Sequence, residues 1–139
     1  LLSPSYSMQT ISTPNAPAPA GHYSQATVHQ GIVYVAGQLP FDPKHPELLP
    51  DNPGDQTRNV LENVRVILEA ANSSLSKTLQ MTIYVTDIDH WPAVNAAYAE
   101  VMGTHRPARA VVPVGDLRPG CILEVQAIAA QEVSEDTRI

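Results

Sequence analysis

The stretch from Pro107 to Gln126 most constrains the fold, because it reads as two strands that each carry one charge where a buried strand should carry none. Arg109 lies among small and β-branched residues in the first strand, and Glu124 lies among aliphatic residues in the second. An ionised side chain in a low-dielectric interior is costly unless it is paired or hydrogen-bonded. The two charges therefore need an explanation.

Residue types alone leave several explanations open. Arg109 and Glu124 could form a structural salt bridge, or could occupy edge positions that face water. They could also belong to a binding or catalytic site, because sites gather charges in the same way. The rest of the chain has to decide between these readings.

Strand and helix patterns alternate along the chain, which predicts the order ββαβαββ and a single α+β domain. A short edge strand at Met8–Ser12 could precede this order, and residues 41–54, which are rich in proline, are expected to form a long loop. The predicted elements are strands Ala26–His29 and Ile32–Ala36, ended by residues 37–40, a helix capped by Asp55 and closed by Asn72, a strand Leu79–Val85, a helix Trp91–Met102 stopped by Gly103, and strands near Ala108–Val112 and Ile122–Ala130.

Both helices carry an apolar stripe at helical spacing. The stripe of the first helix is predicted to be Val60, Leu61, Val64, Ile67, Leu68 and Ala71, and that of the second Trp91, Val94, Tyr98 and Val101. The segment Asp87–His90 looks like a ligand cluster, but an Asp ahead of Pro92 in a first helical turn predicts a turn and a helix cap.

The domain is expected to span residues 15–130, between a flexible arm at 1–14 and a tail at 131–139. The first seven residues carry no basic segment of the secretory kind, and we expect them to be an addition ahead of a native start at Met8. Both ends are therefore expected to lie outside the core of the fold.

Composition narrows the function. A formal charge of -6, with basic residues scattered along the chain, argues against nonspecific binding of nucleic acid. The single cysteine, Cys121, fits a reducing compartment and hence the cytoplasm, while the histidines lack metal-ligand spacing, so no metal is expected. No apolar run approaches the ~18 residues of a membrane span, so no membrane partner is expected.

One face of the sheet has nothing in the chain to cover it, because two helices can cover only one face. In the last strand Leu123 and Val125 alternate with Glu124 and Gln126, and Ile128 adds an apolar group to the second set. A half-apolar face without a local cover indicates burial against another subunit.

With these residues in view, the chain resembles the reactive intermediate deaminases, the RidA/YjgF/YER057c/UK114 family. The resemblance covers nearly everything from residue 15 to residue 130. The matching stretches are NAPAPAGHYSQA (15–26), VYVAGQLPFDP (33–43), QTRNVLENVRVILEAANSSL (56–75), TIYVTDIDHWPAVNAAYAEVMG (82–103) and RPARAVVPVGDLRPGCILEVQAIA (106–129).

The resemblance implies a chorismate-mutase-like α+β fold and a homotrimer, with the sheets packed into a central barrel and the sites between subunits. It also implies hydrolysis of reactive 2-imino or enamine acids to 2-keto acids and ammonia, a reaction for which no cofactor is expected. Arg109 would anchor the substrate carboxylate through two parallel hydrogen bonds, and Glu124 would position or activate water.

Further substrate contacts are implied by the same resemblance. Tyr23 and the backbone of Gly37 match pocket positions, Val111 matches a position where a backbone contact is expected, and Asn95 is a weaker match that could equally be a surface or capping residue. Three departures bear on substrate range. Ala36 stands where the family often has Ser or Thr, Val111 where many members have Cys, and Gln126 where a second Glu is usual.

Two other functions compete with the deaminase. A noncatalytic module could bind small carboxylates or a protein partner through the same Arg109, and the departures at Ala36 and Gln126 motivate this alternative. A ribonuclease or translation inhibitor, an activity attached to some members of the family, is the least favoured on physical grounds because the chain is acidic.

Overall fold

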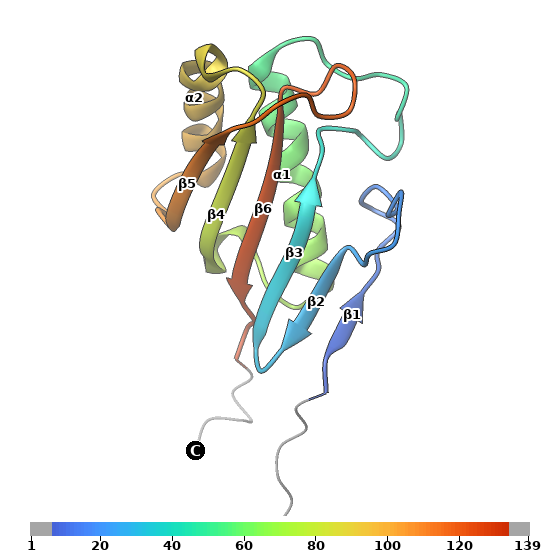
Figure 1. Cartoon of the computed structure of the whole chain (residues 1–139). Helices are drawn as coiled ribbons and strands as arrows, with labels where there is room; N and C mark the ends of the chain where they lie inside the picture. The colour runs from blue at the N-terminus through green and yellow to red at the C-terminus, as the bar shows by residue number, and fades with distance from the viewer. Residues whose placement is uncertain (1–6, 134–139) are drawn as a thin grey trace, which may run out of the picture.

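A six-stranded mixed sheet with two helices packed behind it forms the fold (Figure 1), in a computed structural model that describes residues 7–133. Residues 1–6 of the expected N-terminal addition, and 134–139 of the expected tail, lie outside the described residues. The elements are β1 (Gln9–Ile11), β2 (Ala26–His29), β3 (Ile32–Gln38), α1 (Pro53–Ala70), the 3₁₀ turn η1 (Leu75–Lys77), β4 (Thr78–Val85), the 3₁₀ turn η2 (Ile88–His90), α2 (Trp91–Met102), β5 (Ala108–Pro113) and β6 (Leu123–Ala130).

The strand order is β1-β2-β3-β6-β4-β5. Strands β4 and β5 are parallel, and the other neighbouring pairs are antiparallel. The predicted ββαβαββ order is confirmed, with β1 as the short edge strand ahead of it. The last strand in sequence, β6, is inserted between β3 and β4, so it forms the middle of the sheet.

The core lies between the sheet and the two helices. The side of β6 that faces the helices contributes Leu123 and Val125, which are fully buried, as are Leu61 and Ile67 of α1. Truncation of such an aliphatic side chain to Ala costs about 2–5 kcal/mol, because the cavity left behind collapses only in part. The predicted stripe of the first helix is confirmed in full by burial of all six residues.

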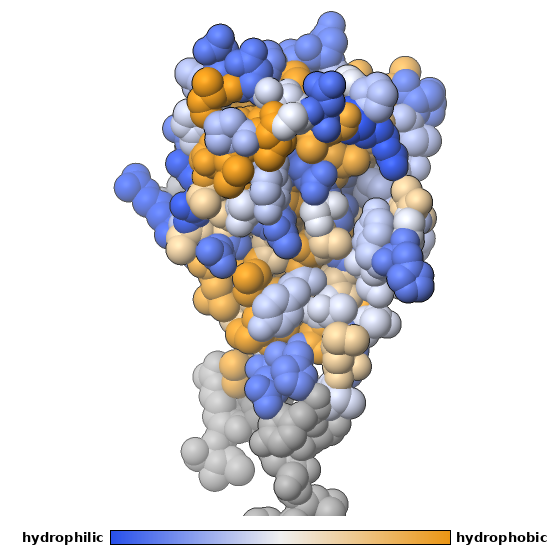
Figure 2. Space-filling view, in the orientation of Figure 1, coloured by the Kyte–Doolittle hydropathy of each residue, from blue (hydrophilic) through white to orange (hydrophobic). Residues whose placement is uncertain are grey.

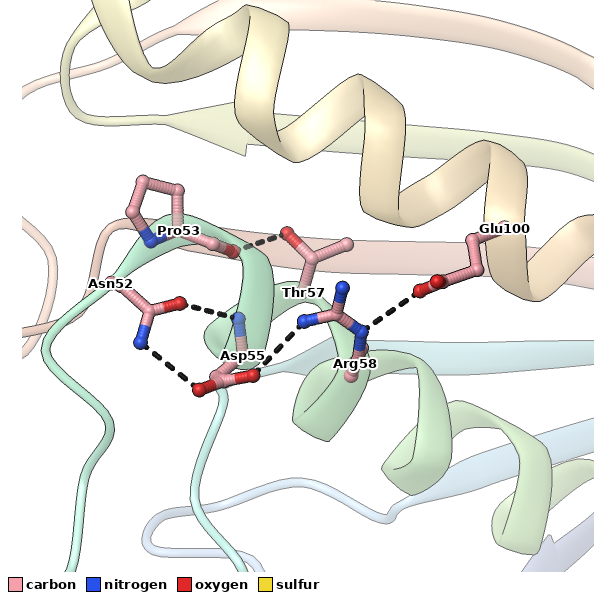
Figure 3. A network of polar contacts seen from close by, with 6 residues as sticks. All are labelled: Asn52, Pro53, Asp55, Thr57, Arg58 and Glu100. Atoms are coloured by element: carbon pink, nitrogen blue, oxygen red, sulfur yellow. Dashed lines mark hydrogen bonds and ion pairs between the residues drawn. The ribbon is translucent and has the colours of Figure 1, made fainter.

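Helix α1 begins at Pro53 and is capped by Asn52, so the prediction of Asp55 as its cap is wrong (Figure 3). The Asn52 side chain accepts a hydrogen bond from the Asp55 backbone N–H at 2.8 Å, and its amide donates to the Asp55 carboxylate at 3.0 Å. Pro53 at the first helical position fixes the start, because its missing N–H is not needed there. Arg58 then pairs with Glu100 of α2 at 2.9 Å and ties the two helices together.

Three local predictions need correction. Strand β3 continues to Gln38, past the predicted end of the hairpin. Asp87 accepts a hydrogen bond from the Asp89 N–H and caps η2. Helix α2 has His90 at its cap position, and the His90 side chain makes no capping hydrogen bond. Val101 is 37% exposed, and the buried face of α2 holds Ala97 and Met102 in its place. The periodicity of a short helix does not fix its rotation to better than one residue.

The opposite face of the sheet is uncovered by any described helix, and Figure 2 shows it with apolar and polar side chains intermixed. Tyr34 of β3 is 46% exposed there, next to its pairing partner Ile128 of β6. This is the half-apolar open face that the strand alternation predicted. Among residues 7–133, neither helix combines the length and the hydropathy needed to span a membrane.

Candidate active site

Arg109 projects from the edge strand β5 on the side of the sheet that faces the helices. Its neighbour in the parallel β4–β5 register is Met81, which is fully buried in the core. The Arg109 side chain itself is exposed, because β5 ends the sheet and α2 covers only part of that edge. The guanidinium therefore lies at the margin between core and solvent.

Helix α2 holds the Arg109 guanidinium with three residues. Arg109 Nη1 donates to Asn95 Oδ1 at 3.0 Å, and the guanidinium carbon lies 4.8 Å from the ring centre of Trp91 and 4.9 Å from that of Tyr98. These residues lie at i, i+4 and i+7, on one side of the helix. Both distances are within cation–π range, so α2 orients the guanidinium and leaves most of its N–H groups free.

Glu124 projects from β6 on the open face. It pairs with Tyr84 of β4, and its neighbours in sequence, Leu123 and Val125, are both fully buried on the helix side. The carboxylate is half-buried, and this burial raises the pKa of Glu124 above its ordinary value of 4.5. A carboxylate with a raised pKa is better suited to accept a proton near neutral pH.

Gly37 is the residue that makes room for Glu124. A β-carbon at Gly37 would collide with the Glu124 carboxylate, so only glycine allows β3 to approach so closely. The register of β3 against β6 shifts between Val35 and Gln38, which places Gly37 in the irregular part of the strand. Gly37 and Glu124 line a cavity of about 260 Å³ together with residues 114–117.

Arg109 and Glu124 thus lie on opposite faces of the sheet within one chain. Among the described residues, Arg109 and Glu124 do not form an ion pair with each other. The structural salt bridge considered from the sequence is therefore contradicted. Arg109 has no carboxylate partner among the described residues. Arg109 and Glu124 therefore have separate surroundings, and a single chain does not bring the two predicted site residues together.

Tyr23 lies near Gly37 rather than near Arg109. The two residues line a small cavity of about 50 Å³ with Phe41 and Arg118, whose guanidinium carbon is 5.4 Å from the Phe41 ring centre. The Tyr23 hydroxyl accepts a hydrogen bond from the Ala20 N–H at 3.2 Å, which holds the ring in the loop ahead of β2. Gly37 thus lines both this cavity and that of Glu124, so the two cavities adjoin at Gly37.

Asn95 and Val111 belong with Arg109. Asn95 holds the guanidinium directly, whereas the Val111 side chain is half-buried against the core, which leaves its backbone as the part available for a contact. Trp91 and Tyr98 were predicted only as core residues, and their contact with Arg109 was missed. The spacing of Trp91, Asn95 and Tyr98 on one helix face was the signal that could have found it.

The structure also shows the contacts of Gln126 and Ala36, two of the residues that depart from the family pattern. Gln126 lines the cavity of Glu124 and accepts a hydrogen bond from the Tyr84 hydroxyl at 2.9 Å. Ala36 takes part in the backbone pairing of β3, and its N–H donates to the Gln25 carbonyl at 2.9 Å. Tyr84 was not predicted as a site residue, because its strand gave no signal beyond β propensity. In residues 7–133, no three His, Cys, Asp or Glu side chains are grouped so as to hold a metal ion.

Comparison with known proteins places this arrangement in a family. The family model described as Endoribonuclease L-PSP matches residues 13–131. A RutC family protein of Pyrococcus horikoshii is 43% identical over 124 residues, which cover 89% of this chain and 98% of the relative. A 2-iminobutanoate/2-iminopropanoate deaminase of Capra hircus is 36% identical over 121 residues, which cover 87% of this chain and 88% of the relative.

Solved structures agree with the sequence comparison. The crystal structure of E. coli TdcF with bound serine matches with a TM-score of 0.84 and 32% identity, over 89% of this chain and 99% of that one. The chain therefore belongs to the Endoribonuclease L-PSP family, which confirms its resemblance to the RidA/YjgF/YER057c/UK114 proteins.

Proposed function

We propose that this protein hydrolyses reactive 2-imino acids, and the enamine acids in equilibrium with them, to 2-keto acids and ammonia. The observation that carries the proposal is Arg109, an exposed guanidinium that α2 orients and that no described carboxylate neutralises. A guanidinium in this state is ready to bind an external carboxylate through two parallel hydrogen bonds.

In this proposal Glu124 positions the attacking water and accepts its proton. Water adds to the carbon of the protonated imine and gives up a proton to the Glu124 carboxylate, which forms a neutral carbinolamine. The proton then returns to the carbinolamine nitrogen, and the carbon–nitrogen bond breaks as the carbinol hydroxyl gives its proton to Glu124, which releases ammonia and the 2-keto acid. Burial raises the pKa of Glu124, so the carboxylate is a better proton acceptor than an exposed glutamate. Gly37 keeps the carboxylate in place by allowing β3 to lie against it.

The complete site is proposed to form between subunits of a homotrimer. Arg109 and Glu124 lie on opposite faces of one sheet, so a substrate cannot contact both within a single chain without a large rearrangement. The uncovered, half-apolar face and the unpaired edge of β5 provide surfaces on which neighbouring subunits can pack. Arg109 with Asn95 and Val111 would come from one subunit, and Glu124 with Gly37 and Tyr23 from the next.

Two relatives support the choice of reaction. One is named for deamination of 2-iminobutanoate and 2-iminopropanoate, and TdcF binds serine, a ligand that also carries a carboxylate. The family model carries the word endoribonuclease, but the formal charge of -6 gives little attraction for phosphates. A deaminase is therefore the better-supported function.

A cytoplasmic location is part of the proposal. The one cysteine, Cys121, is free and buried. Burial raises the pKa of its thiol, which keeps it in the unreactive protonated form. A single free thiol suits a reducing compartment.

The test is hydrolysis of 2-iminobutanoate generated in situ by an amino-acid oxidase, measured for the wild type, Arg109→Ala and Glu124→Gln. We expect the wild type to exceed the spontaneous rate and both variants to lose most of the acceleration. A wild type that leaves the spontaneous rate unchanged would reject the deaminase. Binding of 2-oxobutanoate that depends on Arg109, without any turnover, would support the noncatalytic carboxylate-binding module instead.

A further inference from the structure

A second anion-binding region adjoins Arg109, in a cavity of about 510 Å³ between α2 and the start of β5. Its lining includes Asn95, Tyr98, His105, Arg106 and Arg109, and no Asp or Glu takes part in it within the described chain. The protein has 14 acidic and 8 basic residues, so two guanidiniums and an imidazole around one cavity without an acid run against its overall charge. Such a cavity attracts anions.

Arg106 is the unusual member of this lining. It forms no hydrogen bond or ion pair with any residue between 7 and 133, whereas Arg58 and Arg65, on the surface of α1, are both paired with carboxylates. His105 is already held, because its Nε2 lies 2.9 Å from the Thr78 carbonyl oxygen. The lining therefore leaves the Arg106 side chain free, next to an Arg109 guanidinium that donates a hydrogen bond to Asn95.

Tyr98 provides a second, independent observation. Its side chain lines the same cavity and is only 6% exposed, and its hydroxyl is buried without a hydrogen-bond partner among the described residues. Arg109 lies over the ring, and its guanidinium has only N–H donors, so it cannot accept the hydroxyl proton. Buried hydroxyls without a partner are uncommon, and an anion beside the ring would supply the missing acceptor.

The size of the cavity indicates what the anion belongs to. A four-carbon imino acid held on Arg109 would leave most of about 510 Å³ empty. Arg106 and Arg109 are three residues apart, so their Cα atoms are separated by at most ~10 Å, and two long, flexible side chains can converge on one ligand across that distance. A five-carbon dicarboxylate has its two acidic ends at the separation that such a pair of arginines can reach.

We propose that this cavity receives an acidic side chain of the substrate, so that the protein prefers dicarboxylic 2-imino acids. The α-carboxylate binds Arg109, and the second carboxylate binds Arg106, which determines the specificity. This inference rests on the proposed function, since it takes Arg109 as the anchor of the α-carboxylate. It adds to that function the class of substrate and a residue that the sequence did not single out.

Binding is tested first with the two keto acids that correspond to the products, 2-oxoglutarate and 2-oxobutanoate, by titration calorimetry. We expect the wild type to bind 2-oxoglutarate about tenfold more tightly or better, because a charged hydrogen bond is worth roughly that much. Arg106→Gln should remove the preference and leave the affinity for 2-oxobutanoate unchanged. Arg106→Lys, which keeps the charge but not the fork of donors, should retain part of it.

Lys44→Gln is the matched control, because it removes one positive charge from a loop that does not line this cavity. It should keep the preference in full, which would exclude an effect of net charge. Equal binding of the two keto acids by the wild type, or a preference that survives Arg106→Gln, would overturn the proposal.

A kinetic arm separates this inference from the function on which it rests. With 2-iminoglutarate and 2-iminobutanoate generated in situ, Arg106→Gln should lower kcat/KM about tenfold for the first and leave the second unchanged. Turnover of both imines without dependence on Arg106 would reject the inference and keep the deaminase. Tight, Arg106-dependent binding of 2-oxoglutarate without turnover would support the role of Arg106 and reject the deaminase.

Discussion

Arg109 and Glu124 belong to one sheet but meet opposite surroundings. Arg109 lies on an edge strand, is exposed, and has its orientation fixed by Asn95 and two aromatic rings. Glu124 lies on the central strand, is half-buried, and has its pKa raised by that burial. In the proposed reaction, Arg109 must stay charged and keeps its contact with water, whereas Glu124 must exchange a proton and is partly removed from water.

Mixing two inactive variants tests most directly whether Arg109 and Glu124 act together from different subunits. Arg109→Ala and Glu124→Gln should each reduce kcat/KM by about 100-fold or more, because each removes a charged group from the reaction. When the two are co-expressed with different tags and the mixed trimers are purified, about a third of the wild-type activity should return, since one of the three interfaces in each mixed trimer pairs an intact Arg109 with an intact Glu124. Mixed oligomers that stay inactive would show that both residues act within one chain.

Gly37→Ala tests the surroundings of Glu124 alone. The added β-carbon collides with the carboxylate, which can move aside, so we expect kcat to fall about tenfold or more while Tm changes little. Gly21→Ala is the matched control, because its β-carbon would meet only the Tyr23 ring at 3.7 Å, an ordinary contact. Retention of full kcat in Gly37→Ala would contradict the role given to the Glu124 position.

Trp91→Leu tests the surroundings of Arg109. Loss of one cation–π contact should raise KM for the imino acid about three- to tenfold with little change in kcat, and Trp91→Phe should restore most of the affinity. In an Arg109→Ala background the substitution should have no further effect, because Trp91 acts through Arg109. Trp91 is the only tryptophan, so its fluorescence should also report keto-acid binding. An additive loss in the double variant would mean that Trp91 contacts the substrate itself.

The smallest expected effect is on stability. A carboxyl with a folded-state pKa above 4.5 binds its proton more tightly when folded, so the contribution of Glu124 to stability is greatest at low pH and declines as pH rises from 4.5 through the raised pKa. Glu124→Gln cannot ionise, and it should show a slightly higher Tm than the wild type at pH 7, with the difference vanishing below about pH 4.5. Thermal unfolding followed by circular dichroism across this range checks the sign. A gain that grows toward low pH would contradict it.

Much of the fold was predictable because local signals agreed with one another. The bounds of α2 followed from Pro92 in its first turn and Gly103 after its last, and the stripe of α1 followed from its spacing. The cap of α1 was missed because Asn52 and Asp55 are both good capping residues three apart. In the structure Asn52 caps the Asp55 backbone N–H, and the Asp55 carboxylate accepts a hydrogen bond from the Asn52 side chain, with Pro53 marking the first helical position.

The site was harder to predict than the fold. The sequence indicated Arg109 and Glu124 as charges in strands, but it could not show that they face opposite ways. That depends on the register of two non-neighbouring strands against β4, where Met81 pairs with Arg109 and Tyr84 pairs with Glu124. A shift of one residue in either register would reverse the face. Pairing register is set by packing across the whole sheet, which no local pattern contains.

The parallel pairing of β4 and β5 through α2 has a consequence for how the two halves of the site form during folding. Arg109 and every residue that holds it belong to the continuous β4–α2–β5 segment, so this half needs only contacts between residues close in sequence. The position of Glu124 depends on pairing of β3 with β6, whose partners Gln38 and Val125 are separated by most of the chain. Because closing a long loop slows folding, the surroundings of Arg109 are expected to form early and those of Glu124 late.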